Sequence, residues 1–479
     1  MSAIPDLIKI GNIPTQTVQD IFTHIQEPVT FSSESGMKFV LEPKGFLHSN
    51  SKLTIGLKSN ATLGAKAQLP YGVGINSVIK NCRLLIGGQT ISETSDWNML
   101  QSYKSMFVPN EVMKERDQVA SSQNNCARFN YKSGAGVQLQ VPNTNASNIV
   151  LDNGREYDAG VLPTNAESVA GVPTDVSRYL WQQLDSEPVF TIALSDLFSV
   201  LKRNSLPLYM IKEPVSILIE FEDSIHRCIV DEGTTADDMA TPIDVDRNEC
   251  KIIADYIMYN GELMSQFAEA NKSLSFQFTD YRLSKATLTQ ASALNQIRNV
   301  GGAGRVVSAL ITGINNEKVD GVADSLLGKY HSLAPINTYG DADASLRRNG
   351  TLTSNVRYND RFLFSIDRKN PAVHFHDTKE AEGMIPFVSS QLYSDEQKIW
   401  GDLNYNGTGQ TEEYKGLVGK YFWQSYRLNR GERINSKGIE LYSTMELPAR
   451  AGDNFTQRTW IEMQKIAELK DGFMTCYFA

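Results

Sequence analysis

The sequence predicts an all-β chain folded as two consecutive β-sandwich units, with long loops and few short helices. The chain has 479 residues, which exceeds the roughly 250–300 residues at which a single core stops growing. Strand-like patterns occur from residue 36 to the C-terminus, interrupted by stretches rich in Gly, Asn, Ser, Thr and Pro. Strands that alternate with turn residues in this way are typical of β-sandwiches.

Three strand signals mark the first half. Residues 36–58 contain the runs MKFVLEP and SKLTIGLK, separated by turn-prone residues. The segment SVIKNCRLLIGGQTISE predicts a hairpin, because Gly87 and Gly88 can adopt the positive φ that a two-residue turn requires. In the third signal apolar residues recur with a period of two, which predicts a half-buried strand. These residues are Val215, Ile217, Ile219 and Phe221.

A short helix is predicted before that strand. Its apolar face follows the i, i+3, i+4, i+7 spacing and consists of Leu194, Leu197, Phe198 and Leu201. Ser195 is the predicted N-cap, because a serine hydroxyl can accept a hydrogen bond from a free N–H of the first turn. Pro207 cannot continue a helix, so we expect the chain to turn a corner there and enter the strand.

The second half contains runs of the same kind. Predicted strands lie in LSFQFTDYRL, RVVSALITGI, RFLFSI, KGLVGKYFWQSYRL and GIELYSTMEL. The C-terminal segment RTWIEMQKIAELKDGFMTCYFA is expected to form two strands around a turn at Asp471 and Gly472. A helix over residues 460–469 is the alternative, because the spacing of the apolar residues there is ambiguous.

These patterns divide the chain into four predicted parts: an N-terminal arm (1–26), a first β unit (27–223), a linker (224–249) and a second β unit (250–479). The linker is assigned because that segment is acidic and poor in aromatic residues. Long loops are predicted at residues 133–175, 331–357 and 376–414. Connections of this length are usually functional.

Composition and charge exclude several classes of protein. The net charge is −9 and the pI is about 5.4, so a surface that wraps nucleic acid, which needs many Lys and Arg residues, is not expected. No run of about 18 apolar residues occurs, so no membrane span is expected. The N-terminus lacks the order of a signal peptide and the five cysteines are scattered, so we expect free thiols in a protein kept inside a cell.

No motif of a common catalytic class occurs. The sequence contains no G-x-S-x-G, H-E-x-x-H, Walker A or G-x-G-x-x-G motif. We therefore predict that the protein is not an enzyme and uses no cofactor. A β-sandwich hydrolase with two catalytic carboxylates stays an alternative, because the 55 acidic residues offer no way to select a pair.

One segment, GDLNYNGTGQTEE, fits the spacing of a calcium-binding loop. Two features weaken the fit. The following residues, YKGLVGKYFWQ, are strand-like where such a loop needs a helix, and only one anionic residue precedes the loop glycine. We therefore predict a surface turn and commit to no metal. The candidate ligands are Asp402, Asn404, Asn406, Thr408 and Glu413.

Two other segments carry weaker metal signals. In VHFHD, His374 and His376 would share one face of a strand with Asp377 adjacent, which is half a metal site at most, and a surface strand is the prediction. In DVDRNECKIIAD, Glu249 occupies the position where a calcium loop needs glycine, so no site is predicted.

The segment LSDLFSVLKRNSLPLYMIKEPVSILIEFE joins the predicted helix, a Leu-Pro-Leu corner and the alternating strand. It resembles the segment that closes the first jelly roll in double jelly-roll major capsid proteins, in particular those of polinton-like viruses and virophages. Near the C-terminus, LPARAGDNFTQRTWIEMQ is similar to the turn before the final strands in the related capsid proteins of large DNA viruses. The resemblance in letters is confined to such segments, while the predicted architecture agrees over nearly the whole chain.

This resemblance implies two consecutive eight-stranded antiparallel jelly-roll sandwiches that stand perpendicular to a shell. It also implies a homotrimer that forms a pseudo-hexameric capsomer, because three chains with two similar units each present six similar sides. The expected protein is a major capsid protein of an icosahedral virion, assembled inside the host cell. Its expected partners are itself, neighbouring capsomers and penton or minor capsid proteins, without sequence-specific binding of nucleic acid.

The N-terminal arm carries an amphipathic stretch formed by Val18, Ile21, Phe22 and Ile25. With the resemblance in hand, we expect it on the inner face of the shell. The alternative function is a two-domain β-sandwich binding module that recognises carbohydrate or a surface receptor through its loops. Aromatic residues in the long loops keep this alternative open, and they are Tyr157, Tyr339, Tyr358, Tyr393, Trp400 and Tyr405.

Overall fold

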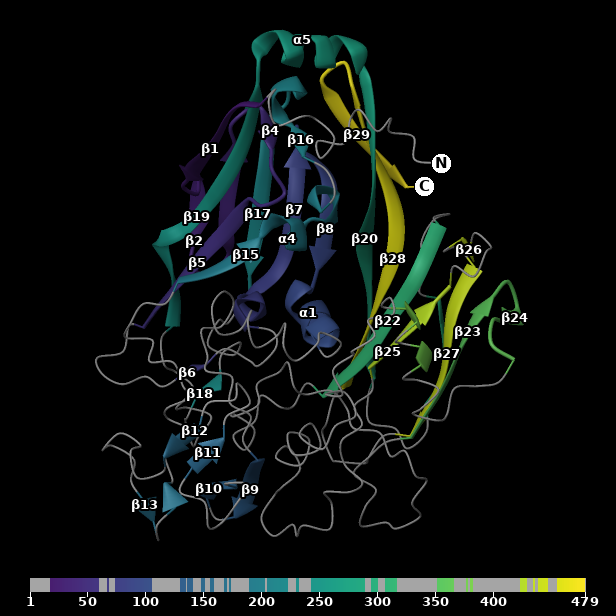
Figure 1. Cartoon of the computed structure of the whole chain (residues 1–479). Helices are drawn as coiled ribbons and strands as arrows, with labels where there is room; N and C mark the ends of the chain where they lie inside the picture. Colours follow the sequence, from purple (N-terminus) through teal and green to yellow (C-terminus); the bar gives the residue numbers. More distant parts are fainter. Residues whose placement is uncertain are drawn as a thin grey trace.

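The computed structural model describes residues 18–59, 67–68, 74–105, 130–134, 136–140, 148–150, 156–158, 168–169, 172–173, 189–202, 205–222, 230–231, 243–288, 294–299, 306–316, 351–365, 376–377, 380–381, 423–428, 434–435, 438–446 and 455–478. Four large antiparallel sheets form two β-sandwich units that lie side by side (Figure 1).

The first unit consists of two sheets. The six-stranded sheet has the order β15-β5-β19-β4-β16, with β1 paired to β19. Its strands are β1 (Val18–Gln26), β4 (Phe46–Leu47), β5 (Lys52–Ser59), β15 (Val189–Ala193), β16 (Leu206–Pro207) and β19 (Ile243–Tyr259). The five-stranded sheet has the order β2-β3-β17-β7-β8. Its strands are β2 (Thr30–Ser32), β3 (Gly36–Leu41), β7 (Ile79–Ile86), β8 (Gln89–Ser95) and β17 (Val215–Phe221).

The second unit repeats this arrangement. Its six-stranded sheet has the order β20-β28-β22-β25, with β26 paired to β22 and β29 paired to β28. The strands are β20 (Ser273–Leu288), β22 (Val306–Asn316), β25 (Trp423–Arg427), β26 (Ile434–Asn435), β28 (Phe455–Lys470) and β29 (Phe473–Phe478). The four-stranded sheet has the order β21-β27-β23-β24. Its strands are β21 (Leu294–Asn299), β23 (Thr351–Tyr358), β24 (Arg361–Phe362) and β27 (Ile439–Glu446).

Helices are few and short. The α-helices are α1 (Trp97–Ser105), α4 (Leu194–Leu197) and α5 (Gly261–Ala270), and the 3₁₀ helices are η4 (Gly74–Val78), η7 (Ser199–Leu201) and η8 (Leu208–Met210). None of the helices in the described ranges is long and apolar enough to span a membrane. The all-β prediction with few short helices is therefore confirmed.

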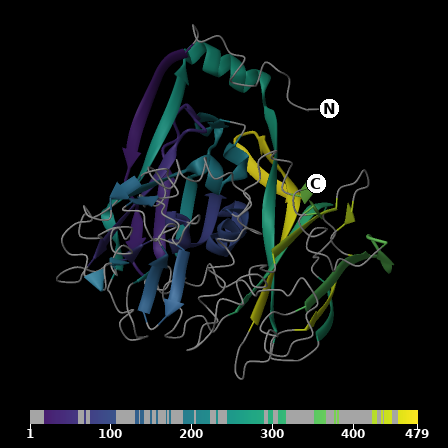
Figure 2. The same cartoon turned by 60° about the horizontal axis from the view of Figure 1, so that its bottom comes forward.

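Four pairs of short strands lie at the end of the molecule away from α5 (Figures 1 and 2). They are β6 (Ala67–Gln68) with β18 (Val230–Asp231), β9 (Asn130–Gly134) with β10 (Gly136–Gln140), β11 (Asn148–Val150) with β12 (Glu156–Asp158), and β13 (Ser168–Val169) with β14 (Val172–Pro173). Several of them fall in the segment predicted as the first long loop.

The predicted number of strands agrees with the large sheets. In the described part of the chain, strands of five or more residues number eight in the sandwich of each unit. The additional strands are two or three residues long, and they extend the sheets at their margins. The predicted strand in RFLFSI is one of these, because only Arg361 and Phe362 are in β24 before the chain bends.

The two predicted hairpins form. β7 pairs with β8 across Gly87 and Gly88, whose φ angles are 57° and 83°. β28 pairs with β29 across Asp471 and Gly472, whose φ angles are 53° and 89°. These left-handed conformations are the ones that two-residue hairpin turns require. The alternative of a helix over residues 460–469 is therefore wrong.

The predicted helix over residues 194–201 is interrupted. Phe198 is extended, with φ −127° and ψ 106°, so α4 ends before it and η7 follows it. Ser195 is not the N-cap, because Ala193 occupies that position without a side-chain hydrogen bond. The backbone N–H of Leu194 donates instead to the carbonyl of Ser51 at 2.9 Å, which ties the start of α4 to the neighbouring sheet. All four apolar side chains are nonetheless buried.

Two predicted segments differ from the structure in their secondary structure. Residues 18–26, assigned to the arm, form β1, which pairs with β19 from Val18 to Gln26. Residues 243–249, assigned to the linker, belong to β19, and this strand pairs with β5 and β4 of the first unit. The acidic composition misled the prediction, because the strand tolerates it: Asp244 pairs with Lys58 in β5, and Glu249 lies at an irregularity of the pairing between Asp246 and Lys251. The domain boundaries themselves stay predictions.

The chain passes from one unit to the other through α5, which bridges the ends of β19 and β20 (Figure 1). The side chain of Asn260 caps this helix by accepting from the N–H of Glu262 at 3.1 Å. Its apolar side chains pack on a small cluster formed by Phe46, Ile257 and Tyr259. The sequence analysis did not predict this helix, although Asn260 and Glu262 are a typical start signal.

Candidate functional site

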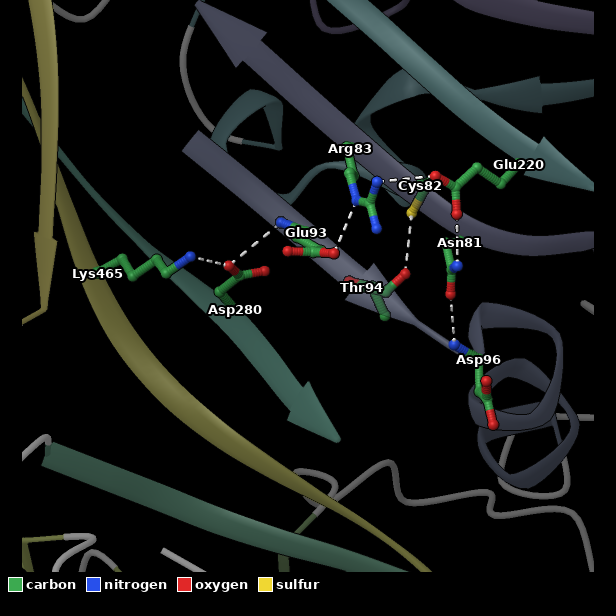
Figure 3. Close-up of polar contacts among 9 residues, drawn as sticks. All are labelled: Asn81, Cys82, Arg83, Glu93, Thr94, Asp96, Glu220, Asp280 and Lys465. Carbon is green, nitrogen blue, oxygen red and sulfur yellow. Dashed lines mark hydrogen bonds and ion pairs between the residues drawn. The ribbon is translucent and has the colours of Figure 1, made fainter. Parts of the chain in front are cut away.

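A chain of polar contacts crosses the boundary between the two units (Figure 3). β8, an edge strand of the first unit, lies beside β20 of the second. We call this region the junction. It is built from β7 and β8 on one side and from β20 and β28 on the other, with contributions from β17 and the start of α1.

The register of β20 and β28 determines which side chains enter the junction. The two strands pair over sixteen residues, from Ser273 opposite Lys470 to Leu288 opposite Phe455. Because side chains alternate between the faces of a strand, one face carries every second residue. On that face lie the buried residues Leu274, Phe276, Phe278 and Asp280 of β20, and Met463, Lys465, Ala467 and Leu469 of β28.

Asp280 is the buried acid of this face. It is 3% exposed and forms an ion pair with the Lys465 ammonium. The Ser92 hydroxyl donates to its Oδ1 at 3.2 Å, and the Glu93 N–H donates to its Oδ2 at 3.3 Å. Burial raises the pKa of the Asp280 carboxyl above its ordinary value, while the Lys465 ammonium and the backbone donors oppose that shift.

Lys465 is the matching buried base, with 8% exposure. Its ammonium also donates to the carbonyl of Ile91 at 3.4 Å and lies 4.8 Å from the centre of the Phe478 ring. An ammonium this close to a ring face is attracted by the ring quadrupole. The base therefore contacts three different strands, namely β8, β20 and β29.

From Glu93 the contacts continue into the first unit. The Arg83 Nε donates to Glu93 at 2.7 Å and its Nη1 donates to Glu220 at 2.7 Å. Glu220 in turn accepts from the Asn81 amide at 2.6 Å. The carbonyl oxygen of the Asn81 side chain accepts from the backbone N–H of Asp96 at 3.1 Å. Figure 3 shows these residues as one connected row over β17, β7 and β8.

The row returns to the second unit at Asp96. Its Oδ2 accepts from Arg458 at 3.0 Å and from the more exposed Lys285 at 2.5 Å. Next to it, the indole N–H of the fully buried Trp460 donates to the carbonyl of Ser95 at 3.0 Å. The two units are therefore joined by charged hydrogen bonds in the middle of β8, at Ile91, Ser92 and Glu93, and directly after its end, at Asp96.

Cys82 lies on β7 between Asn81 and Arg83, two residues of this row. It is fully buried near the carbonyls of Thr94 and Leu197, at 4.0 Å and 3.8 Å from the sulfur. Burial is the main cause that raises the pKa of this thiol far above its ordinary value. A thiol held in its neutral form is a poor nucleophile, so Cys82 acts as a packing residue.

A cleft of about 500 Å³ opens along the junction, and Glu93, Ser95, Tyr281, Lys285 and Phe478 are among its lining residues. Among its charged lining residues, Asp280 pairs with Lys465 within the second unit, Glu93 pairs with Arg83 within the first, and Lys285 pairs across the boundary with Asp96. Among the described residues, no group of three or more His, Cys, Asp and Glu side chains could hold a metal ion. What this arrangement can do chemically is hold the two sandwiches in a fixed relative position.

The predicted metal candidates do not lie at the junction. All five candidate calcium ligands, Asp402, Asn404, Asn406, Thr408 and Glu413, lie outside the described residues, as does His374. His376 and Asp377 are in a helical turn and not in the predicted strand. Glu249 is part of β19 and not of a loop. The calcium loop therefore stays a weak hypothesis.

The sequence analysis missed the junction residues. A signal for two of them was present, because Asp280 and Lys465 interrupt apolar alternation in long strands. A charged residue on the buried face of a strand needs a partner. An acidic and a basic residue that both occupy such positions can therefore be predicted to form an ion pair with each other. Nothing in the sequence indicated that β8 would supply Ser92 and Glu93.

Comparison with known proteins adds to this geometry. No protein-family model and no curated protein matches the sequence. VP54 of PBCV-1, fitted into a reconstruction of the virophage Sputnik, matches with a TM-score of 0.55 at 10% identity, over 96% of this chain and 97% of that chain. A chain from the 3.5 Å structure of the Sputnik virophage matches with a TM-score of 0.54 at 10% identity, over 100% of this chain and 93% of that chain.

The chain has the double jelly-roll fold. The prediction of two consecutive jelly rolls is thus confirmed by a likeness that extends over both units. In this double jelly roll the junction lies between the two jelly rolls, and α5 connects them.

Proposed function

We propose that this chain is the major capsid protein of an icosahedral virus and assembles as a homotrimeric, pseudo-hexameric capsomer. The observation that carries the proposal is the likeness of the whole chain, both jelly rolls included, to chains of virus particles. A chain of the PBCV-1 virus capsid matches with a TM-score of 0.54 over 96% of this chain and 97% of that chain, in addition to the Sputnik chain described above.

The internal repetition explains how such a chain can tile a shell. Each chain supplies two jelly rolls of similar size, so a three-fold ring of chains presents six similar sides to its neighbours. Closed rotational symmetry is the usual form of soluble homo-oligomers, and a six-sided tile can be surrounded by copies of itself. A single jelly roll per chain would need six copies for the same outline.

The junction supports the same function. A capsomer must keep its shape when it contacts neighbouring capsomers, and this requires a fixed orientation of the two jelly rolls relative to each other. Inter-domain contacts within a chain usually permit motion unless they are large and apolar. Here apolar residues of β20, β28 and β29 join the core of the first unit. The buried Asp280–Lys465 pair of the second unit adds specific hydrogen bonds to Ser92, Glu93 and Ile91 of the first.

The partners follow from this proposal. They are other copies of the chain, neighbouring capsomers and penton or minor capsid proteins, and the protein would reside in the virion. The net charge of −9 favours a shell that leaves condensation of the genome to other proteins.

The test is the mass of the purified chain in solution. Three copies of the 53.3 kDa chain give about 160 kDa by light scattering, and negative-stain images of the same peak should show hexagonal outlines. A chain that stays monomeric at high concentration would contradict the proposal. It would favour the binding-module alternative, which a glycan screen would then examine.

A further inference from the structure

The Asp280–Lys465 pair is more completely withdrawn from water than other ion pairs of the chain. The Lys465 and Asp280 side chains are 10% and 4% exposed. In four other lysine–carboxylate pairs of the described residues, the lysine side chain is at least 29% exposed. Each buried ion loses its hydration, so an uncharged linkage between the same two side chains would remove a cost that the ion pair carries.

The two residues lie on neighbouring strands. Asp280 of β20 lies opposite Met463 of β28, and Lys465 of β28 lies opposite Phe278 of β20. They are therefore diagonal neighbours on one face, a position from which long side chains can meet. The Lys465 ammonium already contacts Oδ2 of Asp280 (Figure 3). A covalent bond between the lysine Nζ and the carboxyl carbon Cγ would thus leave the pairing of the strands unchanged.

The hydrogen bonds around the pair suit an amide as well as they suit two ions. The Ile91 carbonyl accepts from Nζ at 3.4 Å, and the Ser92 hydroxyl donates to Oδ1 at 3.2 Å. In an amide that joins the two side chains, the N–H would keep the Ile91 carbonyl and the carbonyl oxygen would keep the Ser92 hydroxyl. Every buried polar atom of the linkage would have a partner, and neither charge would remain.

The same surroundings favour the reaction that forms an amide. When an amine attacks a carboxyl carbon, negative charge develops on oxygen, and hydrogen-bond donors already in place stabilise it. The Ser92 hydroxyl is such a donor at Oδ1, and the Glu93 N–H is another at Oδ2, at 3.3 Å. Burial raises the pKa of the Asp280 carboxyl, and the protonated acid is the form that an amine attacks.

The fold also supplies the contact that the reaction needs. Groups held together in the right geometry react as if each were present at about 10⁵–10⁸ M. Asp280 and Lys465 both line the cleft at the junction, which gives a released water molecule a path to the solvent. The pair combines contact, burial and donors for both carboxyl oxygens.

We propose that Lys465 and Asp280 condense after folding to form an isopeptide bond. The ammonium first transfers a proton to Oδ2, which leaves a neutral amine and a neutral carboxylic acid. The lone pair of Nζ then forms the Nζ–Cγ bond, and the Cγ–Oδ2 bond breaks. Oδ2 leaves as water with its own hydrogen and one from Nζ, so atoms and charges balance without an oxidant or a cofactor.

Such a bond would lock the junction. It connects two residues that are 185 positions apart in the sequence, so it restricts the unfolded chain by closing a long loop. β20 and β28, the strands that it joins, both contribute apolar residues to the core of the first unit. The inference goes beyond the proposed function and does not depend on it.

The first experiment is mass spectrometry of the intact, denatured wild-type chain. The mass should be lower than the mass of the sequence by one water molecule, once the N-terminal peptide has been sequenced to account for processing. A wild-type chain with the full mass of its sequence would overturn the inference.

Two lysine variants assign the loss of water to this pair. Lys465→Arg should have the full mass of its sequence, because the amine that forms the bond is gone. Lys285→Arg is the matched control, because Lys285 contacts Asp96 at the same junction but is 45% exposed. The control should lose one water molecule as the wild type does. Loss of water from Lys465→Arg would contradict the assignment.

Asp280→Asn tests the other partner. If the asparagine reacts, its side-chain nitrogen leaves, so the chain becomes lighter by one ammonia molecule instead of one water molecule. If it does not react, the variant has the full mass of its sequence. Either result is expected when Asp280 is the partner, whereas an Asp280→Asn chain that still loses water would place the bond elsewhere.

Peptide mapping of the wild type locates the bond independently of any variant. A tryptic digest should contain a branched peptide in which a β20 segment with Asp280 is joined to a β28 segment with Lys465, and trypsin should not cleave after this lysine. A loss of water that maps to any other peptide would overturn the inference.

The outcomes are separate from those for the proposed function, because the mass of one polypeptide does not depend on its oligomeric state. A trimer whose chains have the full mass would leave the capsid proposal in place and overturn the isopeptide bond. A monomer whose chain has lost water would do the reverse.

Discussion

Asp280 and Lys465 are two ionisable side chains on a strand face that is otherwise apolar. Removing two charges from water costs several kcal/mol per ion, and their attraction compensates only when geometry and additional hydrogen bonds are favourable. Here Ser92, Glu93 and Ile91 supply those hydrogen bonds from β8. The pair therefore makes stability depend on the correct placement of the first unit against the second.

Lys465→Met should destabilise the fold by about 3–5 kcal/mol, because it leaves the Asp280 carboxylate buried without its partner. Urea unfolding at pH 7 measures this loss. Lys285→Met is the matched control at the same junction, because Lys285 is largely exposed and Asp96 keeps Arg458. The control should lose less than about 1 kcal/mol.

The pH dependence of this variant has a definite sign. In Lys465→Met the folded-state pKa of Asp280 lies further above its unfolded-state value, since burial raises it and the ammonium no longer opposes. The folded state then binds the proton more tightly, so the extra destabilisation is present above the folded pKa and decreases as the pH falls through it. A difference from wild type that is constant with pH would contradict this account.

Only part of the junction could be predicted from the sequence. The positions of Asp280 and Lys465 on the inward face follow from alternation in their strands, which single-sequence patterns can identify. Their partners Ser92 and Glu93 belong to an ordinary polar strand, and the approach of β8 to β20 is a tertiary property. No local pattern encodes a contact between segments so distant in the sequence.

Among the elements, the two hairpins form where the turn residues in the sequence predict them. Two-residue turns require left-handed backbone, and Gly-Gly and Asp-Gly supply it in the β7–β8 and β28–β29 hairpins. These elements were predicted correctly because the determining residues are adjacent. α4 and η7 were predicted wrongly as one helix, because Phe198 between them is extended, while a hydrogen bond from Leu194 to Ser51, which directly precedes β5, holds the start of α4.

Two glycine substitutions should separate turn strain from a steric clash. Gly36 has φ 137°, and a Cβ there would lie 2.1 Å from the Ile219 carbonyl oxygen of β17, so Gly36→Ala should cost about 2–4 kcal/mol. At Gly88, φ is 83° and a Cβ would meet nothing within 4 Å, so Gly88→Ala should cost only about 1 kcal/mol. Urea midpoints measure both, and equal losses would contradict the predicted clash.

At the scale of the whole molecule, the main hydrophobic core contains residues of both units. It combines residues of both sheets of the first unit with six residues of the second: Leu274, Phe276, Phe278, Ala467, Leu469 and Met474. A separate core lies within the second unit and includes Ile461 and Met463. β28 therefore contributes to both cores, so the two jelly rolls are expected to unfold together.

Phe276→Ala tests this cooperativity. Loss of a buried phenylalanine ring costs about 3–5 kcal/mol, and hydrogen exchange should show equal loss of protection in β7 of the first unit and β22 of the second. Leu441→Ala, in the separate core, should likewise lower protection in both. Loss confined to one unit in either variant would indicate that the jelly rolls unfold independently.

The sharing of this core also affects how the protein is made on the ribosome. β19, the last strand of the first unit, is complete at Tyr259, yet that unit still lacks the core residues supplied by β28 and β29. A nascent chain that stops before Met474 therefore displays apolar surface of the kind that chaperones and proteases recognise. Chains that end before these strands are therefore expected to aggregate or to be degraded, while chains that reach the last strand can close the shared core.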